Sequence, residues 1–444
     1  MPCQKIWELA SLSFDPKIPN SKVWKIIKSL SSSHIPKPAW LSILAQENRD
    51  LNTICSLFSS EFNPPANPIP SFPLQLIDAY IFLHKPPLTH ALDSPFLSYE
   101  LRTAICSLRV NSSEGPDGIP NKTLKLLPVK KHSLLLSTFN FVWNYSQFLS
   151  SWKHSIIIPI PKPGKDLSSP SSYRPICLSS CLGKLFEKLV KNRLSWAFEN
   201  FKIYNPHLYG FRSNSSAIDI VLFLTFDIQD ALHNKKEISA IFFDLKSAFG
   251  SVNPRALLCK FLKLGFGTKI NKYIQFFLSP RDSNIKLGSH LSSPFRMEHG
   301  SPQEGVLSPL LFNLTLNDLP SLLNSNIRIA IFADDIAIWS ISDKDIYLQY
   351  AIDQVCDYCT EWGFSLAPEK CRHLFFSKKR RPLPPTLLIY DLSIPLASSH
   401  KFLGVTFDSK LSFLPDIKQL TSKTSTTSNI LKSCTGTSIG RKPP

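Results

Sequence analysis

Apolar and polar positions alternate on both sides of an acidic pair in the last third of the chain. The isoleucines that carry this alternation are Ile327, Ile329, Ile331, Ile336 and Ile338. A period of two is typical of a β-strand, and the parity of the apolar positions changes across the pair. Because a tight hairpin produces such a change, the pattern predicts a β-hairpin with Asp334 and Asp335 at its tip.

A second predicted strand ends on a carboxylate. Ile238, Ala240 and Phe242 share parity with Asp244, the last residue of this strand. Asn253 and Pro254 then supply an N-cap and a first-turn proline to a helix that closes at Gly265. The order of strands and helices predicts an α+β fold whose sheet carries three aspartates at one end.

These three aspartates have two readings. Aspartate is common in turns, so the acidic pair can be a polar hairpin tip and nothing more. Adjacent carboxylates also repel each other, and a hard divalent cation such as Mg²⁺ or Mn²⁺ would relieve that repulsion. Three carboxylates can hold two metal ions at ~3.5–4 Å, the arrangement for in-line phosphoryl transfer.

A predicted basic hairpin lies earlier in the chain. Apolar strands at 155–161 and 173–178 flank a loop with Lys162 and Lys165, and Arg174 begins the second strand. Forked arginine contacts and lysine point charges suit phosphate oxygens, although an exposed solubilising loop is the alternative. Residues 182–201 predict an amphipathic helix whose basic outer face either tracks a nucleic-acid backbone or is simply solvated.

Composition favours a globular protein with a polyanionic partner. The 444 residues are 43% hydrophobic and carry a net charge of +17, which favours nucleic acid over a membrane surface. No apolar run approaches the roughly 18 residues of a membrane span, and the first residues lack a signal-peptide core. We therefore expect an intracellular protein with no membrane partner.

One cysteine cluster resembles a zinc site. Cys356, Cys359, Cys371 and His373 have suitable ligand types. Cys359 nevertheless belongs to one helical stripe of apolar residues, which favours a small buried core residue over a metal ligand.

Nine segments spread over about residues 110–415 match the motifs of one known family in order. The aspartate boxes are Phe243-Asp-Leu-Lys-Ser-Ala-Phe249 and Phe332-Ala-Asp-Asp335, with Gly300-Ser-Pro-Gln-Glu-Gly-Val-Leu-Ser-Pro-Leu-Leu-Phe-Asn313 between them. Upstream and downstream segments follow the family's order: Gly115-Pro-Asp-Gly118, Ile160-Pro-Lys-Pro-Gly-Lys165, Tyr173-Arg-Pro-Ile176, Tyr209-Gly-Phe-Arg212, Trp362-Gly-Phe-Ser-Leu-Ala-Pro-Glu-Lys370 and Phe402-Leu-Gly-Val405. Together the nine segments resemble reverse transcriptases of non-LTR retrotransposons, most like jockey elements.

The resemblance implies a right-hand polymerase with an antiparallel palm sheet that carries the catalytic aspartates. The implied divisions are a helical extension with a proline-rich linker at 1–75, fingers at 76–237, a palm at 238–409, and a partial thumb with a tail at 410–444. The implied activity is an RNA-directed DNA polymerase that joins dNTPs to a DNA primer on an RNA template, in an intracellular, nuclear setting. An endonuclease domain is expected in the full element and is not visible in this sequence.

The same resemblance assigns roles to residues. Asp244, Asp334 and Asp335 would hold two Mg²⁺ ions, with Mn²⁺ as a substitute, and would be catalytic. The substrate-binding positions are Lys162 and Arg174 for the triphosphate, Phe249 against a ribose 2′-hydroxyl, and Gln303 beside the nascent base pair. The nucleic-acid-binding positions are Lys165 and Arg212, with Leu403 and Gly404 in the primer grip.

The chain departs from the family pattern in three places, and two of these departures, Glu304 and the short thumb, favour an alternative, a degenerate fragment that only binds nucleic acid. Gly250 replaces the usual aspartate after Phe249, which we expect to alter packing more than chemistry. Glu304 replaces the glycine of Pro-Gln-Gly, where the backbone approaches the template closely. Few apolar residues after Leu411 remain to build a thumb. A group II intron-type maturase fits less well, because no maturase-like tail follows the palm.

Overall fold

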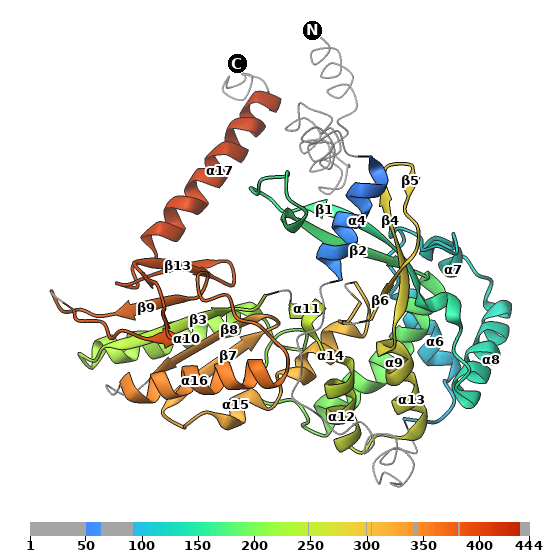
Figure 1. The fold of residues 1–444 in the computed structure, drawn as a ribbon, viewed down its shortest axis with the longest axis horizontal. Helices are drawn as coiled ribbons and strands as arrows, with labels where there is room; N and C mark the ends of the chain where they lie inside the picture. Colours follow the sequence, from blue (N-terminus) through green and yellow to red (C-terminus); the bar gives the residue numbers. More distant parts are fainter. Residues whose placement is uncertain are drawn as a thin grey trace, which may run out of the picture.

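The computed structural model of the chain describes residues 50–63, 92–246, 248–298, 300–302, 304–340, 345–380 and 382–435. Most of the predicted N-terminal helices, the proline-rich segment after Asn63, Gln303 and the polar tail after residue 435 lie outside these ranges. Within them, helices and strands mix along the chain, and the predicted α+β class is confirmed (Figure 1).

One five-stranded sheet, which we call the carboxylate sheet, has the strand order β12-β9-β3-β8-β7. Its strands are β3 (Ile238–Asp244), β7 (Ile327–Phe332), β8 (Asp335–Ser340), β9 (Arg372–Phe376) and β12 (Leu396–Ala397). Strand β3 pairs antiparallel with both β8 and β9, while β12 pairs parallel with β9. The predicted β7–β8 hairpin forms, with Phe332 opposite Asp335.

Both faces of the carboxylate sheet are buried. Ile241, Phe243 and Ile338 point into the main core, which also takes the apolar stripe of α16 (Asp345–Glu361). Phe242 and Trp339 point to the other face, which packs on α10 (Ala217–His233) and on the hairpin of β13 (Ser399–Phe402) and β14 (Val405–Asp408). Side chains alternate along a strand, so Asp244 and Asp335 belong to this second face.

A second sheet, the basic sheet, contains the predicted basic hairpin. Its strands are β1 (His154–Pro161), β2 (Tyr173–Ser179), β4 (Arg281–Leu287), β5 (His290–Leu291) and β6 (Phe295–Met297). Strands β1 and β2 pair antiparallel as predicted, and β1 pairs parallel with β4. Because β4 to β6 come from the predicted palm range, the two predicted ranges interlock in this sheet.

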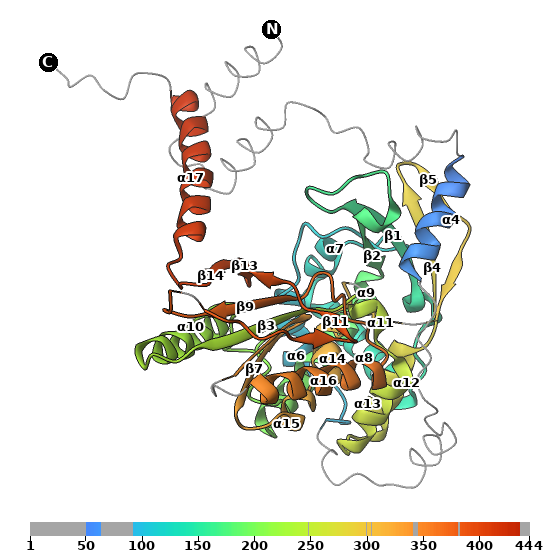
Figure 2. The ribbon, with the colours of Figure 1, turned by 60° about the vertical axis from the view of Figure 1, so that its left-hand side comes forward.

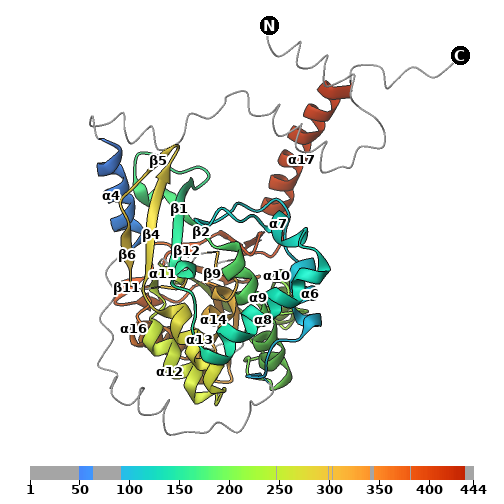
Figure 3. The ribbon, with the colours of Figure 1, turned by 90° about the vertical axis from the view of Figure 1, so that its right-hand side faces the viewer.

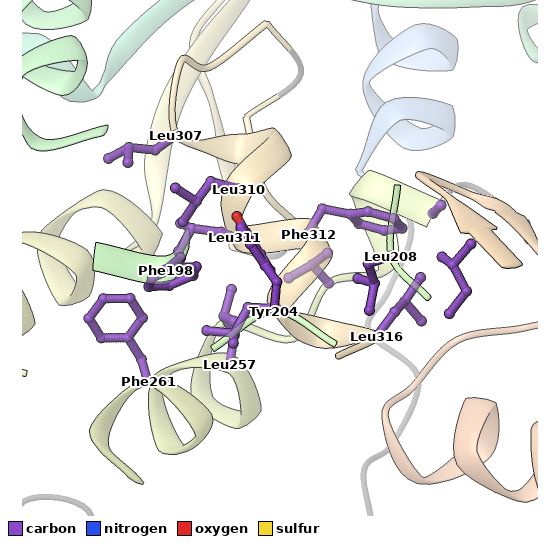
Figure 4. Packing of buried hydrophobic residues seen from close by; sticks show 14 of the residues in the cluster. Phe198, Tyr204, Leu208, Leu257, Phe261, Leu307, Leu310, Leu311, Phe312 and Leu316 are labelled. Carbon is purple, nitrogen blue, oxygen red and sulfur yellow. The ribbon is translucent and has the colours of Figure 1, made fainter. Parts of the chain in front are cut away.

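The main core joins helices from distant parts of the chain. Phe198 of α9 (Cys181–Asn200), Phe261 of α12 (Pro254–Lys263) and Phe312 of α14 (Ser308–Thr315) lie in one cluster of buried residues (Figure 4). Asn253 caps α12 as predicted, because its side chain accepts hydrogen bonds from the backbone N–H groups of Arg255 and Ala256.

The remaining helices surround these layers. They are α6 (Ser98–Cys106), α7 (Asn121–Lys125), α8 (Val129–Tyr145), α11 (Ala248–Ser251), α13 (Thr268–Leu278) and α15 (Leu319–Leu322). A small hairpin pairs β10 (Leu388–Ile389) with β11 (Leu392–Ser393). Helix α17 (Leu414–Thr435) extends away from both sheets (Figure 2), and its Leu414, Ile417 and Leu420 are exposed.

Cys359 is a core residue, as the helical stripe predicted. Its side chain is fully buried in the main core, and this burial raises the pKa of the thiol, which keeps it protonated. Among the residues that the structure describes, no helix is both long and apolar enough to cross a membrane.

Candidate active site

The pairing of β3 with β8 brings two of the predicted aspartates together. Asp244, the last residue of β3, is the direct partner of Asp335, the first residue of β8. Opposed residues of an antiparallel pair have Cβ atoms about 4.5–5.5 Å apart on the same face. The prediction that both aspartates stand at the hairpin tip is corrected in one respect: the loop is Ala333-Asp334, and Asp335 already belongs to the ladder.

The loop that carries Asp334 packs against the Tyr209–Arg212 segment. Ala333 has a φ of +56°, and a positive φ is usual in two-residue hairpin loops that match the twist of their strands. Gly210 packs against this loop so closely that a Cβ there would lie 2.5 Å from the backbone nitrogen of Ala333. The Tyr209–Arg212 segment therefore supports the acidic loop, and only glycine fits at its centre.

The charges of the aspartates are crowded. The pKa of Asp335 is raised to about 6, chiefly by desolvation and further by the charges of Asp334 and Asp244. Nζ of Lys370, in the turn before β9, lies 3.4 Å from Oδ1 of Asp244. Lys370 is in one of the segments that resemble the family, but no local pattern predicted this contact.

The donor chemistry suits a hard divalent cation, because carboxylate oxygens are its preferred ligands. Among the described residues, no group of three or more histidine, cysteine, aspartate or glutamate side chains could jointly hold a metal ion as they stand. The negative charge of Asp244, Asp334 and Asp335 thus suits a cation, but their side chains do not form a complete set of metal ligands as they stand.

A cleft of about 620 Å³ collects five of the predicted or suspected site residues. Its walls include Lys162 and Arg174 of the basic hairpin, Phe249 of α11, Glu304, and Asp334 of the β7–β8 loop. Cations therefore face a carboxylate across one open space. The sequence predicted each of these residues separately, and the fold brings them together.

The basic wall of the cleft is ordered by the β1–β2 hairpin. Arg174 is exposed on β2 opposite Ile160, and Lys162 follows β1 directly. The backbone N–H of Lys162 donates to the carbonyl oxygen of Ser172 over 2.8 Å, and its Nζ donates to that of Ser171 over 2.7 Å. Burial, and then the charge of Arg174, lower the pKa of Lys162, as expected for neighbouring cations.

Phe249 is held in the cleft by other aromatic rings. Its ring stacks on Phe312 with centroids 4.6 Å apart and meets Phe211 edge-on at 6.3 Å. Next to it, a Cβ on Gly300 would lie 2.8 Å from the carbonyl oxygen of Gly250. The two glycines thus pack backbone to backbone at the position where the family pattern has aspartate. The expected effect of Gly250 on packing stays a prediction.

Glu304 occupies a backbone conformation that favours glycine. Its φ is +71°, and the N–H of Gly305 donates to the carbonyl oxygen of Pro302 over 3.0 Å. Glu304 is thus the third residue of a turn, where a positive φ is normally supplied by glycine. The exposed Glu304 side chain lines the cleft.

The segment after Glu304 is fixed by a residue that sequence reasoning missed. Oε2 of Glu187, on α9, accepts a hydrogen bond from the backbone N–H of Val306 over 2.8 Å. Burial raises the pKa of Glu187, and this hydrogen bond opposes the rise. In the sequence, Glu187 is only one polar residue among the lysines of an amphipathic helix.

The four residues that were predicted to contact nucleic acid differ in their surroundings. Lys165 is exposed in the loop after β1. Arg212 is engaged inside the fold, since its guanidinium forms two hydrogen bonds with the carboxylate of Glu199 and donates to the carbonyl oxygens of Asn205 and Leu208. Leu403 and Gly404, with φ of +49° and +91°, form the two-residue turn between β13 and β14. The nucleic-acid roles of all four stay predictions.

Comparison with known proteins gives the family. A family model described as reverse transcriptase (RNA-dependent DNA polymerase) matches residues 160–407, which is more than half of the chain. The probable RNA-directed DNA polymerase from transposon BS of Drosophila melanogaster is 32% identical over 338 residues, 74% of this chain and 37% of that protein. The RNA-directed DNA polymerase from mobile element jockey of the same fly is 27% identical over 408 residues, which cover 89% of this chain and 44% of that protein.

The chain spans less than half the length of these relatives. The matched region contains both aspartate-bearing strands, the β7–β8 hairpin and the Lys162–Arg174 loop. The resemblance to non-LTR, jockey-like elements that the sequence predicted is confirmed by these relatives. The chain belongs to the reverse transcriptase family.

Proposed function

We propose that this chain is the polymerase region of a retrotransposon's RNA-directed DNA polymerase, which extends a DNA primer with dNTPs on an RNA template. The observation that carries the proposal is the cleft in which Lys162, Arg174 and Phe249 share walls with Asp334. Such a space offers cations for a triphosphate, a ring for a sugar and a carboxylate for a metal. We place this activity in the nucleus.

In this proposal the carboxylate sheet is the palm, the basic sheet is the core of the fingers and α17 is part of a thumb. Asp244, Asp334 and Asp335 hold two Mg²⁺ ions, for which Mn²⁺ can substitute. Bound metal would supply Lewis acidity for the primer 3′-hydroxyl and for the leaving pyrophosphate. The raised pKa of Asp335 supports this role, because desolvation, and then the charges of Asp334 and Asp244, disfavour a carboxylate that a bound cation would stabilise.

The chain's own residues bind and orient the substrates. Lys162 and Arg174 neutralise the triphosphate, while the fixed ring of Phe249 lies under the sugar and excludes a 2′-hydroxyl. Gln303 lies beside the nascent base pair. Leu403 and Gly404 guide the primer strand, and Lys165 contacts the nucleic-acid backbone. Positioning of this kind lowers the entropy cost of bringing the reactants together.

A degenerate fragment that only binds nucleic acid is the second candidate. Glu304 favours it, because a carboxylate in the cleft opposes a triphosphate and its residue occupies a glycine-type conformation. The exposed apolar residues of α17 favour it too, since a thumb would bury them.

Primer extension on an RNA template with Mg²⁺ and dNTPs tests the proposal. Asp334→Asn should abolish extension while leaving template binding and the melting temperature close to wild type. Asp353→Asn removes the same charge from an exposed position on α16, outside the cleft, and should extend normally. Template binding without extension by the wild type would favour the degenerate fragment, and activity in Asp334→Asn would refute the assignment of the aspartates.

A further inference from the structure

Helix α4 (Leu51–Phe62) lies upstream of the region that matches the family, yet it is built into the basic sheet. Its buried face, with Ile54 and Phe58, packs against Tyr173 and Ile285 in a separate hydrophobic cluster. The ring of Phe58 meets that of Tyr173 edge-on at 5.0 Å. Figure 3 shows α4 beside β4, so the helix covers this sheet as an integral layer.

The C-terminal end of α4 reaches the cleft. Glu61 and Phe62 line it together with Lys162 and Arg174. Two contacts fix this end: Phe62 is buried in the same hydrophobic cluster, and Nδ2 of Asn63 donates to the carbonyl oxygen of Arg296 over 3.0 Å. The two residues that follow Glu61 therefore hold it in the cleft wall.

Glu61 does not stabilise helix α4. It is the penultimate residue of α4, where the helix dipole presents its negative end and disfavours a carboxylate. Its charge does act on the cleft, because Glu61 favours the protonated form of Lys162 and offsets part of the lowering of that pKa. A carboxylate in this place is best explained by an effect on what the cleft binds.

We infer that Glu61 is an affinity-determining residue for the incoming triphosphate: its carboxylate competes with phosphate oxygens for Lys162 in the cleft. The inference rests on the proposed function, since it takes the cleft to be the triphosphate site. Its consequence is that α4, outside the matched region, belongs to the substrate-binding unit. Glu61 weakens triphosphate binding and eases release of the pyrophosphate product.

Binding of inorganic tripolyphosphate, measured by titration calorimetry without divalent cation, tests this without primer, template or catalysis. Glu61→Gln should bind ~3- to 30-fold more tightly, in the range for one partly screened charge near an anion. Arg174→Ala should bind more weakly. Glu361→Gln removes the same charge from an exposed position at the end of α16 and should match wild type.

A double variant tests the route. If Glu61 acts through Lys162, then Glu61→Gln should tighten binding by less than twofold in a Lys162→Met background. In primer extension, Glu61→Gln should lower the KM for dTTP, with kcat unchanged or lower, and should do so only when Lys162 is present. A kcat that falls with KM fits slower product release.

The outcomes separate the inference from the proposed function. Equal tripolyphosphate affinity in wild type and Glu61→Gln overturns the inference, and so does no binding by either protein. Tighter binding by Glu61→Gln with no extension by any variant upholds the inference about the cleft and refutes the polymerase proposal. Normal extension with an unchanged KM in Glu61→Gln refutes the inference alone.

Discussion

Asp244 and Asp335 stand directly opposite each other in the ladder between β3 and β8, at the end of two otherwise apolar strands. Neighbouring carboxylates on one face of a sheet destabilise it. The pKa of Asp335 is raised to about 6, first by desolvation and then by the charges of Asp334 and Asp244, so both burial and repulsion disfavour its charged form. The fold therefore keeps a local electrostatic strain at the place where the proposed metal ions would relieve it.

Asp335→Asn should stabilise the metal-free protein while abolishing extension. Because the folded-state pKa is raised, the folded state binds more protons between about pH 4 and 6, and the wild type should lose stability as the pH rises through this window. The gain for Asp335→Asn at pH 7.5 should be about 1 kcal/mol, since the side chain is exposed and screened.

Thermal melts with EDTA or Mg²⁺ measure this effect. Mg²⁺ should raise the melting temperature of the wild type more than that of Asp335→Asn. Asp230→Asn, at an exposed position on α10, is the control and should leave both the pH dependence and the Mg²⁺ response unchanged. A metal-free melting temperature that falls in Asp335→Asn would contradict the strain at this site.

Local patterns in the sequence predicted both aspartate-bearing strands, because alternation and parity depend only on neighbouring residues. They did not predict that β9 would flank β3, since that pairing joins segments more than a hundred residues apart. Arg212 shows the same limit: its sequence motif suggested a nucleic-acid contact, while the fold places Glu199 within reach of its guanidinium.

The roles of Glu61 and Glu187 also depend on tertiary contacts. Each is an ordinary polar residue of an amphipathic helix until packing sets it against Lys162 or the Val306 N–H. Helix α17 is a different case. The resemblance implied a partial thumb at 410–444, and the structure has a helix there whose Leu414, Ile417 and Leu420 are exposed.

Phe249→Val should relax the choice of sugar. Removing the ring opens space where a 2′-hydroxyl would lie, so discrimination against rNTPs should fall by ~10- to 200-fold with dNTP use largely retained. Single-nucleotide incorporation of dTTP and UTP measures the ratio of kcat/KM. Phe226→Val, the same change at an exposed position on α10, should keep full discrimination, and unchanged discrimination in Phe249→Val would remove the sugar role.

His373 should make the carboxylate sheet sensitive to acid. Its ring is buried on β9, with Nε2 3.1 Å from Oγ of Ser239, and burial lowers its pKa to about 4. The folded state therefore resists protonation, so the stability that neutral His373 permits is complete above pH 6.5 and is lost as the pH falls toward 4. At pH 5 the loss should be about 2 kcal/mol.

Urea denaturation at pH 7.5 and pH 5 measures this loss. His373→Gln cannot titrate in this range and should lose about 2 kcal/mol less than wild type between the two pH values. His233, at the exposed end of α10, provides the matched variant His233→Gln, which should behave like wild type. Parallel losses in wild type and His373→Gln would show that the buried imidazole does not set the acid sensitivity.

Glu304 should limit activity through its charge and stability through its backbone, and two substitutions separate these effects. Glu304→Gln removes the charge and keeps a side chain at φ +71°, whereas Glu304→Gly removes both. Unit charges 4 Å apart interact by about 1 kcal/mol in water and about 4 kcal/mol at an effective dielectric near 20. If the carboxylate intrudes on the triphosphate, both variants should extend primers at least tenfold faster than wild type.

Only Glu304→Gly should also gain stability, by roughly 1 kcal/mol, because it alone relieves the left-handed conformation. Primer extension and urea denaturation of the same preparations provide both readings. If wild type extends as fast as either variant, the carboxylate turns away from the substrate and is harmless. If Glu304→Gly gains stability while no protein extends and template binding is normal, the defect lies outside this turn.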